Sequence, residues 1–146
     1  VWLLNIFSPT PYAIPPTYNH SCDPIMPKLL IVDDEADIRE FAKSFFKKRN
    51  IDVLTASGGR QALALIIEEA PNLVLLDVRM EEMTGIEVLR ELRAKNNSSR
   101  IIMVTGVEEE ETVKEANSLG VVGYIHKPLV LEELEKIVLA ELNKPQ

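Results

Sequence analysis

Acidic side chains stand where two apolar runs of the sequence end. Residues 73–76 are all Leu or Val and stop at Asp77, and the run 29–32 stops at Asp33 and Asp34. An apolar run without alternation is typical of a strand buried on both faces of a parallel sheet. Ligands of such sheets bind beyond the carboxyl ends of the strands. Asp77 is therefore the first candidate for chemistry, although alone it could equally cap the next turn.

Two further polar side chains follow later apolar runs. Thr105 comes after residues 101–104, and Lys127 comes shortly after residues 121–125. If these runs are strands of the same parallel sheet, the two side chains meet the three aspartates at one edge. Three carboxylates in a partly buried pocket stay ionised only beside a cation, and oxygen ligands without His or Cys favour Mg²⁺. The set therefore resembles a phosphoryl-transfer site with a carboxylate nucleophile, in which the lysine and the hydroxyl hold phosphate oxygens.

Each of these residues also has a purely structural interpretation. Asp33 and Asp34 could cap the following helix, because aspartate is a preferred residue at helix starts. Thr105 could stabilise a turn, and Lys127 could be a solvated surface charge. His126 is interpreted as a surface or packing residue rather than a ligand. The joint position of the polar residues at four strand ends favours the phosphoryl-transfer interpretation.

The apolar pattern after Met26 predicts five strand–helix units. We place the strands at 29–32, 51–55, 73–77, 101–104 and 121–125. The intervening and final helices have apolar residues spaced three and four positions apart, and the fourth is predicted at 108–118 with Gly120 as its stop. A repeated strand–helix pattern requires a parallel sheet with helices on both faces. The prediction is an α/β, doubly wound fold whose strand order the pattern itself leaves open.

The first 26 residues differ from the rest of the chain. Five prolines punctuate residues 1–24, and Asp23 is the one charged residue there, which argues against helix or strand. The apolar start at residues 1–7 is too short for a membrane span and lacks the basic residues of a secretory signal. We predict a Pro-rich extension at 1–26 that is disordered or foreign to the natural protein, one domain at 27–143 and a tail at 144–146.

Composition narrows the classes of partner and compartment. The 146 residues suffice for one domain with a substantial core. A formal net charge of −7 and an isoelectric point near 4.9 argue against direct binding to nucleic acid or to a membrane surface. The single cysteine, Cys22, excludes an internal disulfide and a cysteine-rich metal site, so a reducing, cytoplasmic location is expected.

The motifs together resemble the receiver domain of bacterial two-component response regulators. The resemblance spans about residues 27–143 and is carried by 29–35, 75–77, Met80 with Gly85, 104–106 and 124–128. It implies a flavodoxin-like strand order, 2-1-3-4-5. It also implies that Asp77 is phosphorylated by a phosphohistidine on a sensor histidine kinase or a histidine phosphotransfer protein. One departure is Glu81, which stands where the family usually has a proline.

The resemblance also implies a role for each site residue. Asp34 and Asp77 would bind Mg²⁺ directly, Asp33 would bind it through water, and the backbone carbonyl of Arg79 would complete the protein ligands. Lys127 would pair with the phosphoryl group.

A switch is implied in the same way. Thr105 would move toward a phosphoryl oxygen and let Tyr124 swing inward, which would reshape the face built from the fourth helix, fifth strand and fifth helix. Such a switch is a shift in population between two packings. Because the sequence stops soon after the last helix, output is expected through a downstream target protein or a homodimer formed by this face.

These expectations describe a signalling switch rather than a turnover enzyme, one that catalyses only its own aspartyl phosphorylation and dephosphorylation. The first alternative is a phosphorylation-independent, receiver-like interaction module, and the intact acidic set weighs against it. The second is a hydrolase or nucleotide-binding enzyme on the same layout. That enzyme would need a glycine-rich phosphate loop after the first strand or a second acid two residues beyond Asp77, and the sequence has neither.

Overall fold

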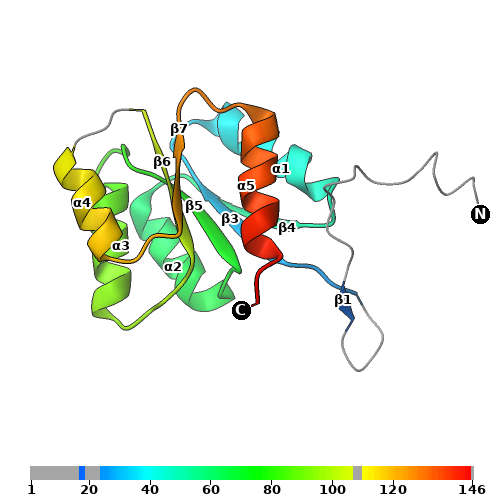
Figure 1. Cartoon of the computed structure of the whole chain (residues 1–146), viewed down its shortest axis with the longest axis horizontal. Coiled ribbons are helices and arrows are strands. Elements are labelled where there is room, and N and C mark those ends of the chain that lie inside the picture. Colours follow the sequence, from blue (N-terminus) through cyan, green and yellow to red (C-terminus); the bar gives the residue numbers. More distant parts are fainter. Residues whose placement is uncertain (1–16, 19–23, 107–109, 146) are drawn as a thin grey trace, which may run out of the picture.

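The chain folds around one five-stranded parallel sheet. The computed structural model describes residues 17–18, 24–106 and 110–145. The main strands are β3 (Lys28–Val32), β4 (Asp52–Ala56), β5 (Leu73–Asp77), β6 (Ile101–Thr105) and β7 (Gly123–His126) (Figure 1). They are ordered β4-β3-β5-β6-β7. Counted from β3, this is the order 2-1-3-4-5, so the predicted flavodoxin-like, doubly wound α/β fold is confirmed.

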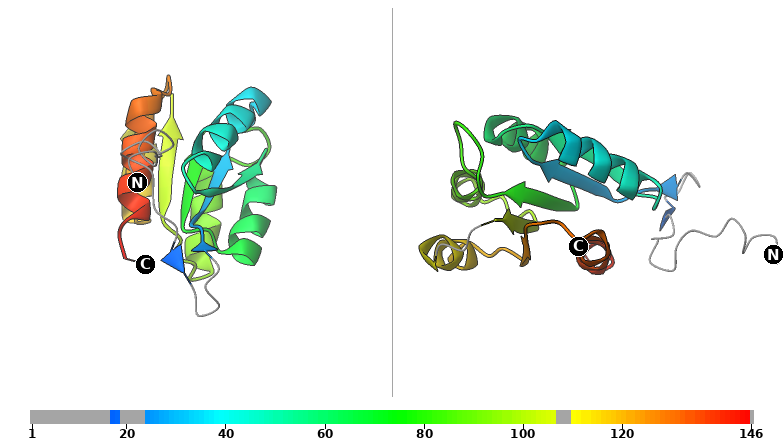
Figure 2. Two further views of the ribbon diagram at one scale, coloured as in Figure 1. Left: turned by 90° about the vertical axis from the view of Figure 1, so that its right-hand side faces the viewer. Right: turned by 90° about the horizontal axis from the view of Figure 1, so that it is seen from above.

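Helices cover both faces of the sheet, as Figure 2 shows. In the described part of the chain they are α1 (Ala36–Lys47), α2 (Gly59–Glu69), α3 (Gly85–Ala94), α4 (Glu110–Ser118) and α5 (Leu131–Leu142). Phe46 of α1 and Val138 of α5 belong to one buried apolar cluster. Ile66, Leu89 and Ala116, from α2, α3 and α4, belong to a second cluster. The helices therefore divide into α1 with α5 on one face and α2 to α4 on the other.

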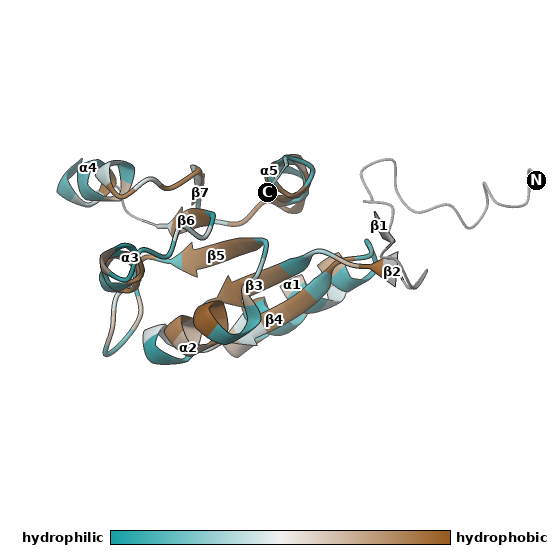
Figure 3. Ribbon diagram, turned by 90° about the horizontal axis from the view of Figure 1, so that it is seen from below, coloured by the Kyte–Doolittle hydropathy of each residue, from teal (hydrophilic) through white to brown (hydrophobic). Residues whose placement is uncertain are grey.

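The central strands explain why the sheet is parallel and two-sided. Every residue of β5 and of β6 is buried. Because side chains alternate along a strand, Leu73 and Leu75 enter the first apolar cluster while Val74 and Leu76 enter the second. Figure 3 shows the result, with hydrophobic strands between helices whose outer faces are hydrophilic. Among the described residues, no helix is long and apolar enough to cross a bilayer.

Several element boundaries differ from the predicted ones. Strand β7 begins at Gly123 rather than residue 121, because the backbone N–H of Val121 still bonds to Ala116 O of α4 at 3.3 Å. Strand β4 begins and ends one residue later than predicted. Helix α4 is described from Glu110, and the predicted start at residue 108 lies outside the described residues.

The expectation of no strand within the first 26 residues is wrong. Strands β1 (Thr17–Tyr18) and β2 (Pro24–Ile25) form a two-stranded antiparallel pair, with Tyr18 opposite Pro24. A proline is compatible with a strand at an edge, where its missing N–H interrupts no ladder, and a two-residue pair consists of edges. Cys22 and residues 1–7 lie outside the described residues.

Candidate functional site

Three of the predicted site residues meet at the carboxyl edge of the sheet. Asp33 follows β3, Asp77 ends β5 and Lys127 follows β7. Lys127 Nζ lies 3.1 Å from Asp77 Oδ2 and 3.6 Å from Asp33 Oδ2. Asp33 is 3% exposed and Asp77 is 2% exposed. One ammonium group therefore bridges two buried carboxylates that lie far apart in the sequence.

The backbone fixes the second oxygen of each carboxylate. Asp33 Oδ1 accepts a hydrogen bond from the N–H of Glu35 at 2.8 Å, and Asp77 Oδ1 accepts one from the N–H of Arg79 at 3.2 Å. Arg39 also donates to the backbone carbonyl of Asp33 at 2.7 Å. Each carboxylate thus has one oxygen on a turn and the other toward Lys127, which sets its orientation.

Burial and neighbouring charges shift the pKa values of Asp77 and Lys127 for different reasons. Burial raises the pKa of Asp77 above its ordinary value, and the negative charge of Asp33 adds to this, although the hydrogen bond and charge of Lys127 act in the opposite sense. Partial burial lowers the pKa of Lys127, but its bond to Asp77 and the charges of Asp77, Asp33 and Glu35 outweigh that effect and raise it. Lys127 therefore stays charged at neutral pH, while Asp77 stands in surroundings that favour an added cation.

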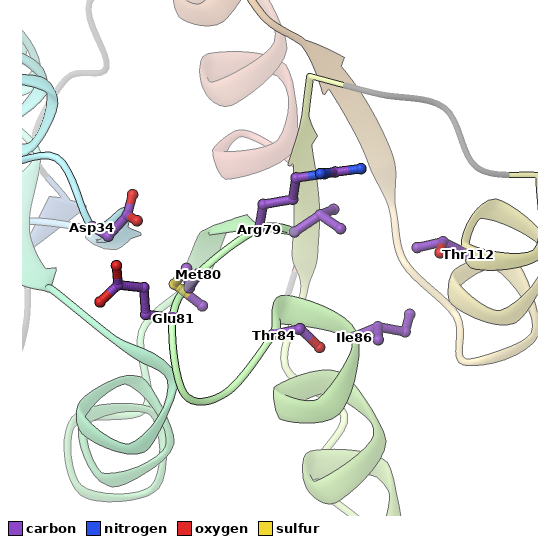
Figure 4. Close-up of a pocket in the computed structure, with 8 residues that line it drawn as sticks. Asp34, Arg79, Met80, Glu81, Thr84, Ile86 and Thr112 are labelled. Carbon is purple, nitrogen blue, oxygen red and sulfur yellow. The ribbon is translucent and has the colours of Figure 1, made fainter.

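The acidic side chains after β3 offer oxygen ligands for such a cation. Carboxylate oxygens of Asp33, Asp34 and Glu35 lie within 4.8 Å of one another. Asp34 and Glu35 are exposed, and Asp34 lines an open pocket of about 600 Å³ together with Arg79 (Figure 4). A set of hard oxygen donors beside an open space fits Mg²⁺, which keeps several water ligands.

The side chain of Arg79 points away from the Asp34 carboxylate in Figure 4. Its backbone, by contrast, is tied to the site through the bond to Asp77. The predicted metal role of Arg79 concerns its backbone carbonyl, and the observed direction of the guanidinium is compatible with that role.

The two predicted switch residues occupy different surroundings. Thr105 ends β6 in a buried position, and its carbonyl accepts a hydrogen bond from the N–H of Lys127 at 2.8 Å. The Tyr124 hydroxyl lies 3.0 Å from the carbonyl oxygen of Val113 and 3.2 Å from Asn117 Oδ1, both on α4. Burial raises the pKa of Tyr124, so the hydroxyl keeps its proton for these contacts. In this structure Tyr124 is therefore anchored to α4.

Gly85 lets the loop after β5 return to the site. Its N–H donates to the carbonyl of Val78 at 2.9 Å. A Cβ atom at this position would lie 2.3 Å from the carbonyl oxygen of Asp77, which is closer than any side chain allows. Glycine is required here because the start of α3 touches the backbone of the candidate nucleophile.

Sequence reasoning missed two acidic residues of the site. It included Glu35 only as part of the motif 29–35, although its position next to Asp33 and Asp34 was the available signal. It noted Glu81 as a departure from the family pattern, yet Glu81 lines the same pocket as Asp34. The loop brings Glu81 to this pocket, and its path could not be predicted because a loop has no hydrophobic periodicity.

Comparison with protein families gives one match over most of the chain. The sequence model described as the response regulator receiver domain matches residues 29–139. Sporulation initiation phosphotransferase F from Bacillus subtilis is 34% identical over 111 residues, which cover 76% of this chain and 90% of the relative. Regulatory protein AtoC from Escherichia coli is 39% identical over 116 residues, or 80% of this chain. The matched part covers 25% of the length of AtoC.

Solved structures show the same architecture. Chemotaxis protein CheY4 from Vibrio cholerae has a TM-score of 0.73 at 30% identity, with 80% of this chain and 98% of that chain covered. A CheY-like response regulator receiver domain protein from Methanospirillum hungatei has a TM-score of 0.77 at 28% identity, with coverage of 82% and 95%.

Proposed function

The chain belongs to the response regulator receiver domain family of two-component signalling, and from this membership we propose that Asp77 accepts a phosphoryl group from a phosphohistidine. Proteins of this family are signalling proteins rather than turnover enzymes. The contact of 3.1 Å between Lys127 Nζ and Asp77 Oδ2 carries the proposal. It holds a positive charge beside a buried carboxylate whose surroundings favour neutralisation of its charge.

The proposed transfer exchanges one bond to phosphorus for another. A carboxylate oxygen of Asp77 attacks the phosphorus atom and forms a P–O bond. The P–N bond to the donor imidazole breaks, and its electron pair stays on the nitrogen, which takes up a proton. Lys127 balances the charge of the incoming phosphoryl oxygens, and the Thr105 hydroxyl donates to one of them. Attack of water on the phosphorus later returns the free carboxylate and inorganic phosphate.

Mg²⁺ is the proposed cofactor of both steps. Asp34 and Asp77 would hold it directly, Asp33 through water, and the carbonyl of Arg79 would be the remaining protein ligand. When bound, the ion supplies stabilisation of the charge on the phosphoryl oxygens. The closely spaced oxygens of Asp33, Asp34 and Glu35 support this assignment, since such a cluster is best accommodated by a hard divalent ion.

Phosphorylation would then bias a conformational equilibrium. As Thr105 moves toward a phosphoryl oxygen, Tyr124 would leave its contacts with Val113 and Asn117 and turn inward. That exchange would change the surface formed by α4, β7 and α5. Charge-assisted bonds made only in the phosphorylated form supply the required difference in free energy between the two packings.

The partners follow from this chemistry. The phosphodonor would be a sensor histidine kinase or a histidine phosphotransfer protein in the cytoplasm, and the altered face would bind a downstream target protein or a second copy of the chain. We assign no direct contact with nucleic acid or membrane to the receiver domain. Within the sequence, residues 27–143 form the proposed domain, with an extension at 1–26 and a tail at 144–146.

The direct test is phosphorylation of the full chain by a small phosphodonor with Mg²⁺, followed on a phosphate-affinity gel. The wild type should shift, whereas Asp77→Asn should not, because an amide does not form the acyl phosphate. Asp52→Asn is the matched control, since Asp52 is an exposed aspartate at the amino end of β4, away from the site. A shift that persists in Asp77→Asn would remove the nucleophile from this position, and no shift in the wild type would favour a phosphorylation-independent interaction module.

A further inference from the structure

Glu81 lies in the loop that joins β5 to α3, and both sides of this loop are anchored. The side chains of Met80 and Met83 are buried in the apolar cluster of α2 and α3. Gly85 ties the end of the loop to Val78 and to the backbone of Asp77. The residues between the two methionines, Glu81 and Glu82, are exposed. The direction of Glu81 is therefore set by a loop with fixed attachment points.

The side chain of Glu81 extends toward the side of the loop on which Asp34 lies, as Figure 4 shows. Both residues line the open pocket of about 600 Å³, and Glu82 does not. In the part of the chain that the structure describes, neither the Asp34 nor the Glu81 carboxylate has a hydrogen-bond or ion-pair partner. Asp33, by contrast, lies 3.6 Å from the ammonium of Lys127. Lys127 and Asp33 do not line this pocket, and its two acids, Asp34 and Glu81, have no ion-pair partner among the described residues.

We propose that Glu81 supplies a further carboxylate to the divalent-cation site of this receiver domain. The inference rests on the proposed function, since it concerns the same cation that Asp34 would hold. Two carboxylates that line the same open, water-accessible space repel each other, and a shared cation reverses that repulsion. Glu81 therefore raises the affinity of the site for divalent ions.

The chemistry of the donors also predicts an effect on ion selectivity. Mg²⁺ needs a compact octahedron and retains water, whereas Ca²⁺ accepts six to eight oxygens with flexible geometry. An additional carboxylate from the loop between β5 and α3 favours the larger ion more than the smaller one. With Glu81 present, the ratio of the affinity for Ca²⁺ to the affinity for Mg²⁺ should be higher than without it.

The test measures cation binding to the full chain by isothermal titration calorimetry, with no phosphodonor present. Glu81→Gln keeps the size and polarity of the side chain but removes its charge. It should weaken Mg²⁺ binding by about tenfold, the lower end of the cost of losing a supporting group at a metal site, and Ca²⁺ binding by a larger factor. Glu82→Gln is the matched control, because it removes the same charge from the neighbouring exposed residue and should leave both affinities unchanged.

The outcomes separate this proposal from the proposed function. Unchanged binding in Glu81→Gln, or equal weakening in Glu81→Gln and Glu82→Gln, would overturn the role of Glu81. If Asp34→Asn abolishes binding in the same series, the cation site itself stands in either case. If the wild type binds no Mg²⁺, or Asp34→Asn binds it normally, the cation site of the proposed function fails and the role of Glu81 fails with it.

Discussion

Helices α4 and α5 flank the same edge strand, β7, but are held in the fold by different forces. In α5 the apolar residues Leu134, Val138, Leu139 and Leu142 are buried against the sheet. Among the described residues of α4, Ala116 alone is buried. Burial of apolar side chains contributes about 1.5 to 3 kcal/mol for each large residue, so the sheet holds α5 far more strongly than α4.

Polar contacts take the place of the missing apolar ones at α4. Arg90 of α3 forms two hydrogen bonds with Glu115, at 2.8 and 3.0 Å. Arg93 donates to the carbonyl of Leu119 at 2.7 Å, and Tyr124 contacts the helix from β7. Water can replace such contacts at small net cost, whereas it cannot replace a packed core. Of the face proposed to switch, α4 is therefore the part able to shift, and α5 is the fixed reference.

The largest expected effect is in the core of α5. Leu139→Ala should lower the free energy of unfolding by about 2 to 4 kcal/mol, because it leaves a cavity in the cluster beneath the helix. Urea unfolding followed by circular dichroism measures this. The matched variant is Val113→Ala on α4, where the side chain is only half-buried, with an expected loss of about 1 kcal/mol or less. Equal losses in the two variants would erase the contrast between the helices.

The polar anchor of α5 should rank next. Arg49 Nε lies 2.6 Å from Glu135 Oε1, and its guanidinium stacks 3.6 Å from the ring centroid of Phe45. Arg49→Ala should destabilise the protein by about 2 kcal/mol, because a nearly buried carboxylate loses its arginine and the ring loses its cation. A double-mutant cycle with Glu135→Gln measures the coupling. A coupling energy near zero would mean that α5 needs no polar anchor.

Removing the carbonyl-binding arginine beneath α4 should cost less overall and act locally. Arg93 donates to the carbonyls of Leu119, Asn97 and Ser99. Arg93→Ala should lower the free energy of unfolding by about 1 to 2 kcal/mol, since several hydrogen bonds to a charged group are lost. Amide exchange at Val121 and Val122 should accelerate while exchange in α5 stays slow. Acceleration in α5 as well would show that α5 and the segment after α4 unfold as one unit.

The smallest expected change in stability comes from the hydroxyl of Tyr124. Tyr124→Phe keeps the ring but removes the contacts with Val113 and Asn117, so the free energy of unfolding should fall by about 1 kcal/mol or less. The variant should also change the populations of the α4 conformers, and the chemical shifts of the α4 amides measure this change. Asn117→Ala should move the same shifts in the same direction. Unchanged shifts in both variants would separate Tyr124 from the position of α4.

The sequence predicts the centre of this fold better than its margins. The bounds of β5, residues 73–77, are as expected, because a run buried on both faces leaves an unmistakable apolar pattern. The predicted start of β7 is wrong by two residues, because the N–H of Val121 bonds to the carbonyl of Ala116 in α4. Residue types predict which segments pack into a core, but they do not predict which backbone groups form hydrogen bonds outside regular elements.

The same distinction holds for the candidate site. The meeting of Asp33, Asp77 and Lys127 could be predicted, since parallel strands bring their carboxyl ends to one edge. The anchoring of Tyr124 on α4 could not, because it depends on a side-chain torsion. The direction of Glu81 could not either, since it depends on how two methionines seat the loop. Position along a strand is readable from the sequence, but orientation in a loop is not.

The close approach of Gly85 to the carbonyl of Asp77 has a consequence for how this protein can diverge. The two ends of segment 78–84 are held together by contacts between the backbones of Gly85, Val78 and Asp77. Residues within this cassette, 78–84, can therefore be exchanged while its ends stay in place. New side chains at Arg79 or Glu81 would alter the electrostatic potential of the pocket without moving the backbone around it. Diversification, natural or engineered, should therefore substitute residues within the cassette while keeping its length and its closing glycine.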